Sequence, residues 1–201
     1  MRIILASASL ARLRTLRAAG LDPEVVVSGV DESTVGAATP AELAQRLANA
    51  KARAVSATAA AQGARLVIGC DSVLDLDGVA LGKPSGPEDA VRRWRTMRGR
   101  SGELVTGHCV IDVPSGREVN ATATTTVFFA QLSDEEIDSY VATGEPQLVA
   151  GGFTLDGLGG AFVERIEGDP HNVVGISLPL LRDLVHRLGV AWVALWGRQL
   201  P

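Results

Sequence analysis

Five charged side chains, spread over separate short segments, have the chemistry to hold a polyphosphate together with a metal ion. Glu32 lies in VDES, Lys51 in NAKA and Asp71 in GCDSV. Arg12 belongs to the N-terminal segment SASLARL, and Lys83 to LGKP. Carboxylate oxygens bind hard cations such as Mg²⁺, whereas lysine and arginine neutralise phosphate oxygens. If the fold brings these residues to one cleft, their types predict a site for a magnesium-bound polyphosphate.

The N-terminal segment adds hydrogen-bond donors to this set. A short apolar run ends in small hydroxyl residues, and a helix rich in arginine follows directly. The unpaired N–H groups and the dipole of such a helix start favour an anion. Ser7 and Ser9 contribute hydroxyl groups, and Arg12, about one turn into the helix, can reach back over the turn. Taken alone, the segment also fits a capped surface helix with solvated arginines.

The position of Asp71 indicates the same chemistry. The run RLVIGC shows no polar alternation and predicts a strand that is buried on both faces. Asp71 is expected at its C-terminal end, and α/β sheets bind ligands beside the carboxyl ends of their strands. Two simpler roles are also compatible with the sequence: Asp71 as a turn cap at the strand end, and Lys83 as a solvated loop lysine.

Hydrophobic periodicity predicts the elements that would position these residues. The expected strands span residues 2–7, 24–30, 65–70, 103–113 and 117–132, the last two forming a long hairpin. The expected helices span residues 9–20, 39–63, 87–99, 133–144 and 178–190, and residues 150–170 form a glycine-rich, irregular stretch. Because strands and helices alternate early and a hairpin comes later, we expect an α/β fold with a mixed sheet.

Local signals support several of these boundaries. Ser9 is the expected N-cap of the first helix, and Ser133 with Glu136 predicts a capping box. Asp77-Gly78 predicts a tight turn. The inner stripe of the longest helix is expected at Leu43, Leu47, Ala50 and Ala54.

The composition is that of an ordinary globular chain. Its 201 residues are 46% hydrophobic and 21% charged, which predicts one domain over residues 1–201. A net charge of -4 and an aromatic content of 4% argue against nucleic-acid binding. The N-terminal apolar run is too short for a signal peptide and no stretch suits a membrane span, so we expect a cytoplasmic location without a membrane partner. Cys70 and Cys109 are expected to be buried free thiols, with a disulfide as the alternative.

Nine short motifs fall in the order that is typical of Maf-like proteins. They are LASASLARLRTL, VDES, NAKA, GCDSV, LGKP, the TG of LVTGHCVI, LSDEEIDSYV, AGGFTLDGLGGAFVERIEGD and NVVGISLPLL. No single motif is long, but their joint order is specific, and it extends from Leu5 to about Leu188. The chain therefore resembles the Maf-like nucleoside triphosphate pyrophosphatases, once named for inhibition of septum formation.

This resemblance implies a fold similar to that of the inosine-triphosphate pyrophosphatases: an elongated mixed sheet flanked by helices, with two lobes, a central cleft and often a homodimer. It implies hydrolysis of a nucleoside triphosphate between its α and β phosphates, giving nucleoside monophosphate and pyrophosphate. The reaction would require a divalent metal cation, Mg²⁺ or Mn²⁺, and would act on non-standard or pool nucleotides. A nucleotide-binding regulator of septation with little turnover is the rival function.

The resemblance also implies roles for individual residues. Asp71 would be the proton acceptor. Beyond the resemblance, we expect Glu32 and Asp71 to hold the metal, directly or through water. A carboxylate beside a metal is a weak base, so orientation of the attacking water is the alternative role of Asp71. The substrate would contact Ser7, Ser9, Arg12, Lys51, Ser72, Lys83 and Asp156, of which Arg12, Ser72 and Asp156 are linked to the choice of base.

Four positions depart from patterns seen in the family. Leu10 and Ala11 stand where many members have proline and then arginine or tryptophan, so one phosphate contact is missing or Arg12 serves alone. Members that prefer dTTP and UTP commonly have Thr and Gln where this chain has Ser72 and Asp156. An acid at Asp156 is nearer to the subfamily linked to 7-methyl-GTP, and it can accept a hydrogen bond from a guanine- or cytosine-type edge. The preferred base is left open.

Overall fold

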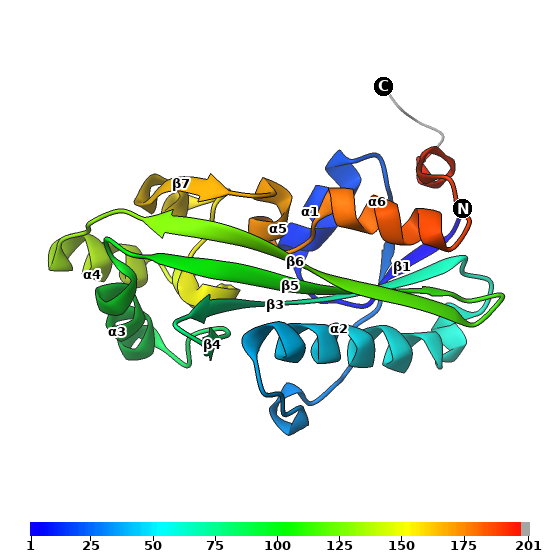
Figure 1. Ribbon diagram of the computed structural model, residues 1–201, viewed down its shortest axis with the longest axis horizontal. Helices are drawn as coiled ribbons and strands as arrows, with labels where there is room; N and C mark the ends of the chain where they lie inside the picture. Colours follow the sequence, from blue (N-terminus) through cyan, green and yellow to red (C-terminus); the bar gives the residue numbers. More distant parts are fainter. Residues whose placement is uncertain (198–201) are drawn as a thin grey trace.

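A mixed sheet of seven strands runs along the length of the molecule (Figure 1). The computed structural model describes residues 1–197. The strands are β1 (Ile3–Leu5), β2 (Glu24–Val25), β3 (Leu66–Leu76), β4 (Val79–Leu81), β5 (Ser101–Asp112), β6 (Arg117–Phe129) and β7 (Val163–Glu167). Their spatial order is β2-β1-β3-β5-β6-β7, with β4 also paired to β3, and only the pairs made by β1 are parallel. The predicted α/β fold with an elongated mixed sheet is confirmed.

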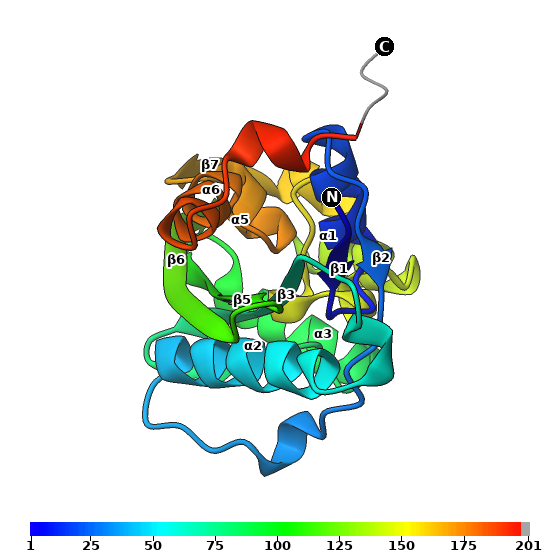
Figure 2. The same ribbon diagram turned by 90° about the vertical axis from the view of Figure 1, so that its right-hand side faces the viewer.

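Helices cover both faces of this sheet. They are α1 (Leu10–Ala18), α2 (Pro40–Ser56), α3 (Pro87–Met97), α4 (Asp134–Ala142), α5 (Pro170–Val174) and α6 (Leu178–Arg187). The long α2 lies along one face, and α1 and α6 lie on the other (Figures 1 and 2). Within residues 1–197, none of these helices is long and apolar enough to cross a membrane.

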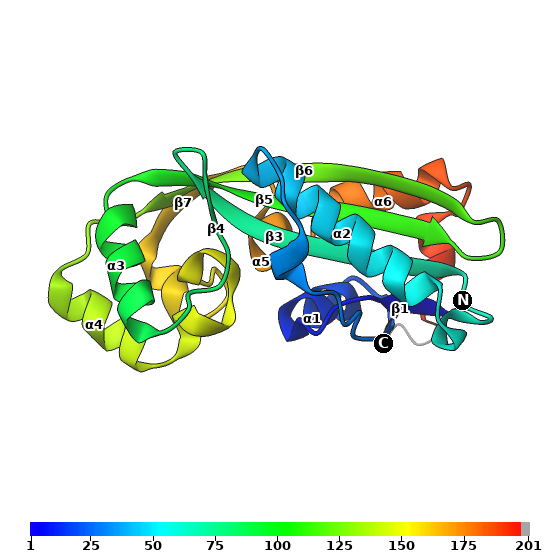
Figure 3. The same ribbon diagram turned by 90° about the horizontal axis from the view of Figure 1, so that it is seen from below.

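The helices gather into the two expected lobes, which share β3, β5 and β6 (Figure 3). The first lobe packs α1, α2 and α6 around β1 and the N-terminal half of β3. The second packs α3 and α4 against the other end of the sheet. Its centre is Trp94, which is fully buried and donates its Nε1–H to the Gly152 carbonyl oxygen at 2.9 Å.

One edge of β3 has an uncovered stretch in its middle. β1 pairs with residues 66–68 and β4 with residues 74–76, while β5 occupies the opposite edge. Among the described strands, none pairs with residues 69–73 on the β1 side; we call this stretch the open edge. The prediction that Asp71 ends a strand was wrong, because pairing with β5 extends β3 through Asp71. Asp71 instead lies beside an opening in the sheet.

Neighbouring side chains of β3 point to opposite faces of the sheet. Ile68 and Cys70 belong to the core cluster that includes side chains of α1 and α6. Val67 belongs to the cluster beneath α2. By the same alternation, Asp71 faces α2 and Ser72 faces α1. The open edge is where groups from the two faces can meet.

The long helix α2 approaches the sheet very closely. A Cβ atom on Gly69 would lie 2.4 Å from the Ala48 carbonyl oxygen, and one on Gly107 would lie 2.4 Å from that of Ala44. Both positions therefore require glycine, because a side chain there would overlap the backbone of the helix. The close approach also brings Lys51, about one turn beyond Ala48, down to the surface of the sheet.

The buried face of α2 differs from the predicted stripe. Leu47 is buried as expected, whereas Leu43, Ala50 and Ala54 are only half-buried. The residues on the buried face are Pro40, Ala44, Leu47, Ala48, Lys51, Ala52 and Val55. Its three alanines, Ala44, Ala48 and Ala52, lie against the two glycines, where larger side chains would hold the helix away from the sheet.

Some predicted boundaries were also wrong. α2 ends at Ser56 rather than near residue 63, and β2 spans two residues instead of residues 24–30. The glycine-rich stretch of residues 150–170 contains β7, which pairs with β6. A five-residue strand owes its conformation mainly to its partner strand, so its own sequence signal is weak.

The local signals, by contrast, are confirmed. Ser9 is the N-cap of α1, and Ser133 with Glu136 forms the capping box of α4. The turn between β3 and β4 has positive φ at Asp77 and Gly78, 55° and 82°. The hairpin of β5 and β6 is present, and both cysteines are buried free thiols.

Gly107→Ala is expected to destabilise the protein by about 1–3 kcal/mol, because the new methyl group overlaps the backbone of α2. Urea unfolding measures the difference. Gly36→Ala is the matched control: a Cβ atom there meets nothing within 4 Å, so the free energy of unfolding should change by less than about 0.5 kcal/mol. A Gly107→Ala protein as stable as the wild type would contradict the close approach of the helix.

Candidate active site

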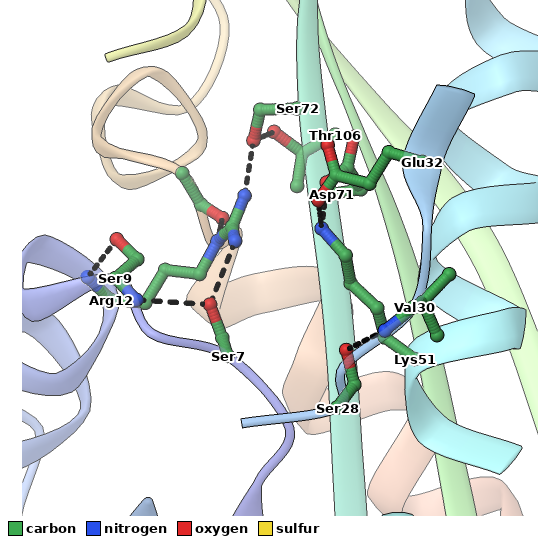
Figure 4. A network of polar contacts seen from close by, with 11 residues as sticks. Ser7, Ser9, Arg12, Ser28, Val30, Glu32, Lys51, Asp71, Ser72 and Thr106 are labelled. Carbon is green, nitrogen blue, oxygen red and sulfur yellow. Dashed lines mark hydrogen bonds and ion pairs between the residues drawn. The ribbon is translucent and has the colours of Figure 1, made fainter. Parts of the chain in front are cut away.

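Polar side chains from several separate segments meet beside the open edge, in two clusters (Figure 4). On the α1 side, the Arg12 cluster comprises Arg12, Ser7, Ser72 and the carbonyl oxygen of Gly175. On the α2 side, the Lys51 cluster comprises Lys51, Glu32 and Asp71. The clusters are neighbours because Asp71 and Ser72 are adjacent on β3 but face opposite ways.

Three neutral oxygens hold the side chain of Arg12. Its Nε donates to the Gly175 carbonyl oxygen at 2.7 Å. Its terminal nitrogens donate to the hydroxyl oxygens of Ser7 and Ser72, each at 3.0 Å. The start of α1 is fixed by Ser9, whose hydroxyl accepts the backbone N–H of Arg12 at 3.3 Å. Arg12 is only 8% exposed, so these contacts set the direction of the guanidinium.

The Arg12 guanidinium forms no ion pair within residues 1–197. Three of its N–H groups are used by the contacts above. The remaining two of the five N–H groups of an arginine have no acceptor in the described part of the chain. A buried cation is costly unless an anion compensates its charge. The arrangement is therefore that of an anion site with two spare donors.

Lys51 bridges two carboxylates on the other face of the sheet. Its Nζ contacts Asp71 Oδ1 and lies 2.5 Å from Glu32 Oε1. Lys51 and Asp71 are buried, whereas Glu32 is exposed on a 3₁₀ turn whose N-cap is Asp31. The charge of Lys51, unlike that of Arg12, is thus fully compensated by the protein.

Asp71 combines burial with one available oxygen. Burial raises the pKa of its carboxyl group above the ordinary value, and the charges of Lys51 and Arg12 oppose this rise without cancelling it. Asp71 Oδ2 makes no hydrogen bond with any residue that the structure describes. A carboxylate oxygen is therefore left for a ligand or a water molecule.

The Lys51 cluster fits a divalent cation that also binds a phosphate. Glu32 and Asp71 converge on the nitrogen of Lys51, so their oxygens reach a common point. Across residues 1–197, no group of three or more His, Cys, Asp or Glu side chains could hold a metal. Mg²⁺ is often bound by one or two carboxylates together with substrate phosphates. The two carboxylates suit such a shared cation, and Lys51 would have to withdraw from the point where it binds.

Three predicted substrate contacts are members of neither cluster: Ser9, which caps α1 next to Arg12, and the more separate Lys83 and Asp156. Lys83 follows β4, and Asp156 belongs to the glycine-rich loop of the second lobe. Both are exposed, and neither forms a hydrogen bond or an ion pair within the described residues. Their contact with substrate stays a prediction. Two surface hollows of about 650 and 410 Å³ lie over α3 and α4, and no residue of either cluster lines them.

Sequence reasoning missed two residues that support Arg12. Gly175 follows α5 with φ 118°, and its carbonyl oxygen accepts from the Arg12 side chain. Thr106 of β5 places its hydroxyl oxygen 2.8 Å from that of Ser72. Both lie in recognised motifs, NVVGISLPLL and LVTGHCVI. The motifs indicated that these two segments matter for the family, but the contacts of Gly175 and Thr106 with Arg12 and Ser72 join distant segments and could not be predicted from the motifs.

The sequence model of the family described as "Maf-like protein" matches residues 2–188. The chain belongs to the Maf-like protein family. Every residue of the Arg12 cluster and the Lys51 cluster lies inside the matched range. The family membership predicted from the order of short motifs is therefore confirmed.

Relatives of this Maf-like chain match it along nearly its whole length. A Salinispora tropica protein is 58% identical over 200 residues, covering 98% of this chain and 88% of its own. A Streptomyces coelicolor protein is 60% identical over 196 residues, covering 98% of this chain and 95% of its own. Each is named nucleoside triphosphate pyrophosphatase. Among solved structures, the Staphylococcus aureus Ham1 protein superimposes with a TM-score of 0.43 at 17% identity, covering 65% of this chain and 72% of that one.

Asp71→Asn is expected to raise Tm at pH 7 in metal-free buffer. Folding raises the pKa of Asp71, so the folded state prefers the protonated acid. The free energy of unfolding therefore falls as pH rises from the ordinary pKa through the raised pKa of Asp71. The variant carries no titrating group there, so the two melting temperatures should converge below the ordinary pKa of 3.8 and separate above it. Thermal unfolding across pH measures this. A lower Tm for the variant at pH 7 would show that attraction to Lys51 outweighs burial.

Proposed function

We propose that this Maf-like protein hydrolyses nucleoside triphosphates between the α and β phosphates, releasing nucleoside monophosphate and pyrophosphate. Its family and the shared name of its relatives support this activity. The observation that carries the proposal is the buried, unpaired guanidinium of Arg12 beside two carboxylates that suit a divalent cation. A triphosphate with its cation supplies the anion that Arg12 lacks and the charge that the carboxylates can hold.

The proposed mode of binding uses both faces of the sheet. Arg12 donates its two spare N–H groups to phosphate oxygens at the open edge. Lys51 withdraws from the carboxylates and neutralises another phosphate oxygen. Ser7 and Ser9 lie beside Arg12 at the start of α1 and border the same phosphate. Attack on an already anionic phosphorus is slow mainly for electrostatic reasons, so this neutralisation is the chief catalytic contribution.

Asp71 is the residue proposed to act on water. Its available oxygen, Oδ2, can accept a hydrogen bond from the attacking water and then its proton, while the bridging P–O bond breaks and pyrophosphate leaves. Burial raises the pKa of Asp71 in the metal-free protein, whereas a cation beside the carboxylate lowers it, so orienting the water is the alternative role of Asp71. When bound by Glu32 and Asp71, a Mg²⁺ or Mn²⁺ ion supplies further neutralisation of phosphate oxygens. No covalent intermediate is needed.

The second lobe completes the proposal. Lys83 is proposed to contact a phosphate oxygen, and Asp156 and Ser72 are proposed to contact the base. A carboxylate such as that of Asp156 can accept hydrogen bonds from ring N–H or amino groups of a base. The expected substrates are non-standard or pool nucleotides. The homodimer implied by the family resemblance and the cytoplasmic location expected from the sequence both stay predictions.

Asp71→Asn should lower kcat for pyrophosphate release by roughly 100-fold or more, since it removes the proton acceptor. The assay incubates the purified protein with Mg²⁺ and a panel of nucleoside triphosphates that includes modified bases. Asp138→Asn, an exposed acid on α4 without polar contacts in the described chain, is the matched control and should behave as wild type. Wild-type protein that binds nucleotides without releasing pyrophosphate would favour the septation regulator instead.

Removal of divalent cations should abolish turnover. EDTA treatment leaves Glu32 and Asp71 paired with Lys51 alone, so the phosphates lose a source of neutralising charge. Adding back Mg²⁺ or Mn²⁺ in excess of EDTA should restore pyrophosphate release. Full activity in EDTA, with metal content checked by elemental analysis, would remove the cation from the mechanism.

A further inference from the structure

A chain of two hydroxyl groups, one half-buried and one fully buried, runs away from Arg12 into the sheet. Ser72 Oγ accepts from Arg12 and lies 2.8 Å from Thr106 Oγ1. Thr106 Oγ1 in turn lies 3.3 Å from the Asn172 carbonyl oxygen, to which it donates. Thr106 and Asn172 are fully buried, so within this part of the structure the protein itself provides the partners of these groups. Figure 4 shows Ser72 between the guanidinium and Thr106.

The two ends of this chain determine where its protons lie. A hydroxyl group carries one proton and two lone pairs. Thr106 donates its proton to the Asn172 carbonyl, which can only accept, so Thr106 must accept from Ser72. Ser72 has then used its proton and presents lone pairs to Arg12, which can only donate. Every group in the chain has a fixed role, and hydrogen bonds aligned in this way strengthen one another.

We propose that Thr106 is a positioning residue for phosphate binding: it holds the Ser72 hydroxyl as an acceptor and thereby fixes the Arg12 guanidinium. This inference rests on the proposed function of Arg12. With Ser72 and Ser7 on its terminal nitrogens, the guanidinium cannot turn, and its two spare N–H groups keep one direction. Without the hydroxyl of Thr106, the Ser72 proton has lost its acceptor and can turn toward the open edge, where it competes with Arg12 for the ligand.

Two variants of Thr106 separate the hydroxyl from the side-chain volume. Thr106→Val keeps the shape and removes the hydroxyl. It should lower kcat/KM for nucleoside triphosphates about tenfold, the size expected if the hydrogen bond between Ser72 and the charged Arg12 is lost as a consequence. Thr106→Ser keeps the hydroxyl and should stay within about twofold of wild type. Equal kcat/KM for Thr106→Val and wild type, with wild type active, would overturn the inference and leave the proposed function intact.

Thr125 is the matched control for a general loosening of the structure. Its hydroxyl is as buried as that of Thr106 and also contacts α5, donating to the Asp169 carbonyl oxygen at 3.0 Å. It contacts neither Ser72 nor Arg12. Thr125→Val should lower Tm by an amount similar to Thr106→Val but keep kcat/KM within about twofold of wild type. An equal loss of kcat/KM in both variants would mean that α5 is loosened, and the proposed role of Thr106 would be wrong.

A measurement without nucleotide tests the position of Arg12 directly. In ¹⁵N-resolved NMR spectra, the Arg12 Nε–H signal is assigned by its disappearance in Arg12→Lys. Thr106→Val should shift it and speed its exchange with water, and Thr106→Ser should not. Ser72→Ala breaks the same chain from its half-buried end and should reproduce the change even if Thr106→Val fails to fold. An unchanged signal in these variants contradicts the inference, whereas a wild-type protein without turnover contradicts the proposed function instead.

Discussion

The interruption of strand pairing beside the middle of β3 is the constraint on which the site depends. Among residues 1–197, no strand pairs with residues 69–73 on the β1 side. Side chains alternate along a strand, so Asp71 and Ser72 face opposite sides of the sheet. Within a fully paired sheet, one ligand could not contact groups on both faces. At the open edge one ligand can contact both faces, and under the proposed function Arg12 of α1 and Lys51 of α2 act on the same phosphate chain.

The charges on the two faces are balanced differently. Lys51 is compensated by two carboxylates, while Arg12 donates hydrogen bonds only to neutral oxygens in the described structure. Two cations and two carboxylates together leave the site without net charge, yet the buried guanidinium keeps an unmet need for an anion. Burial raises the pKa of Asp71, so its ionised form also opposes stability. An uncompensated buried charge and a raised carboxyl pKa are typical of sites that bind a ligand at some cost to the stability of the free protein.

Close packing gives this arrangement its precision. Gly69 and Gly107 let the backbone of α2 lie almost on the sheet, which sets the height of Lys51 above Asp71. On the other face, the C-terminal end of α5 supplies a carbonyl oxygen to Arg12, and β5 supplies a hydroxyl group behind Ser72. The charged groups of the candidate site therefore depend on neutral partners that fix their geometry. Such partners carry no charge pattern by which a sequence reveals them.

The sequence by itself determined the alternation of elements, the helix caps, the hairpin, the family, and the expectation that Arg12, Lys51, Asp71 and Glu32 act together, because these follow from local patterns and motif order. Only the tertiary structure decided that β3 continues past Asp71 and that the four residues are divided between two faces. It alone also showed that the Arg12 guanidinium forms no ion pair among the described residues. These properties arise from contacts between residues up to 163 positions apart, and no local pattern encodes such contacts.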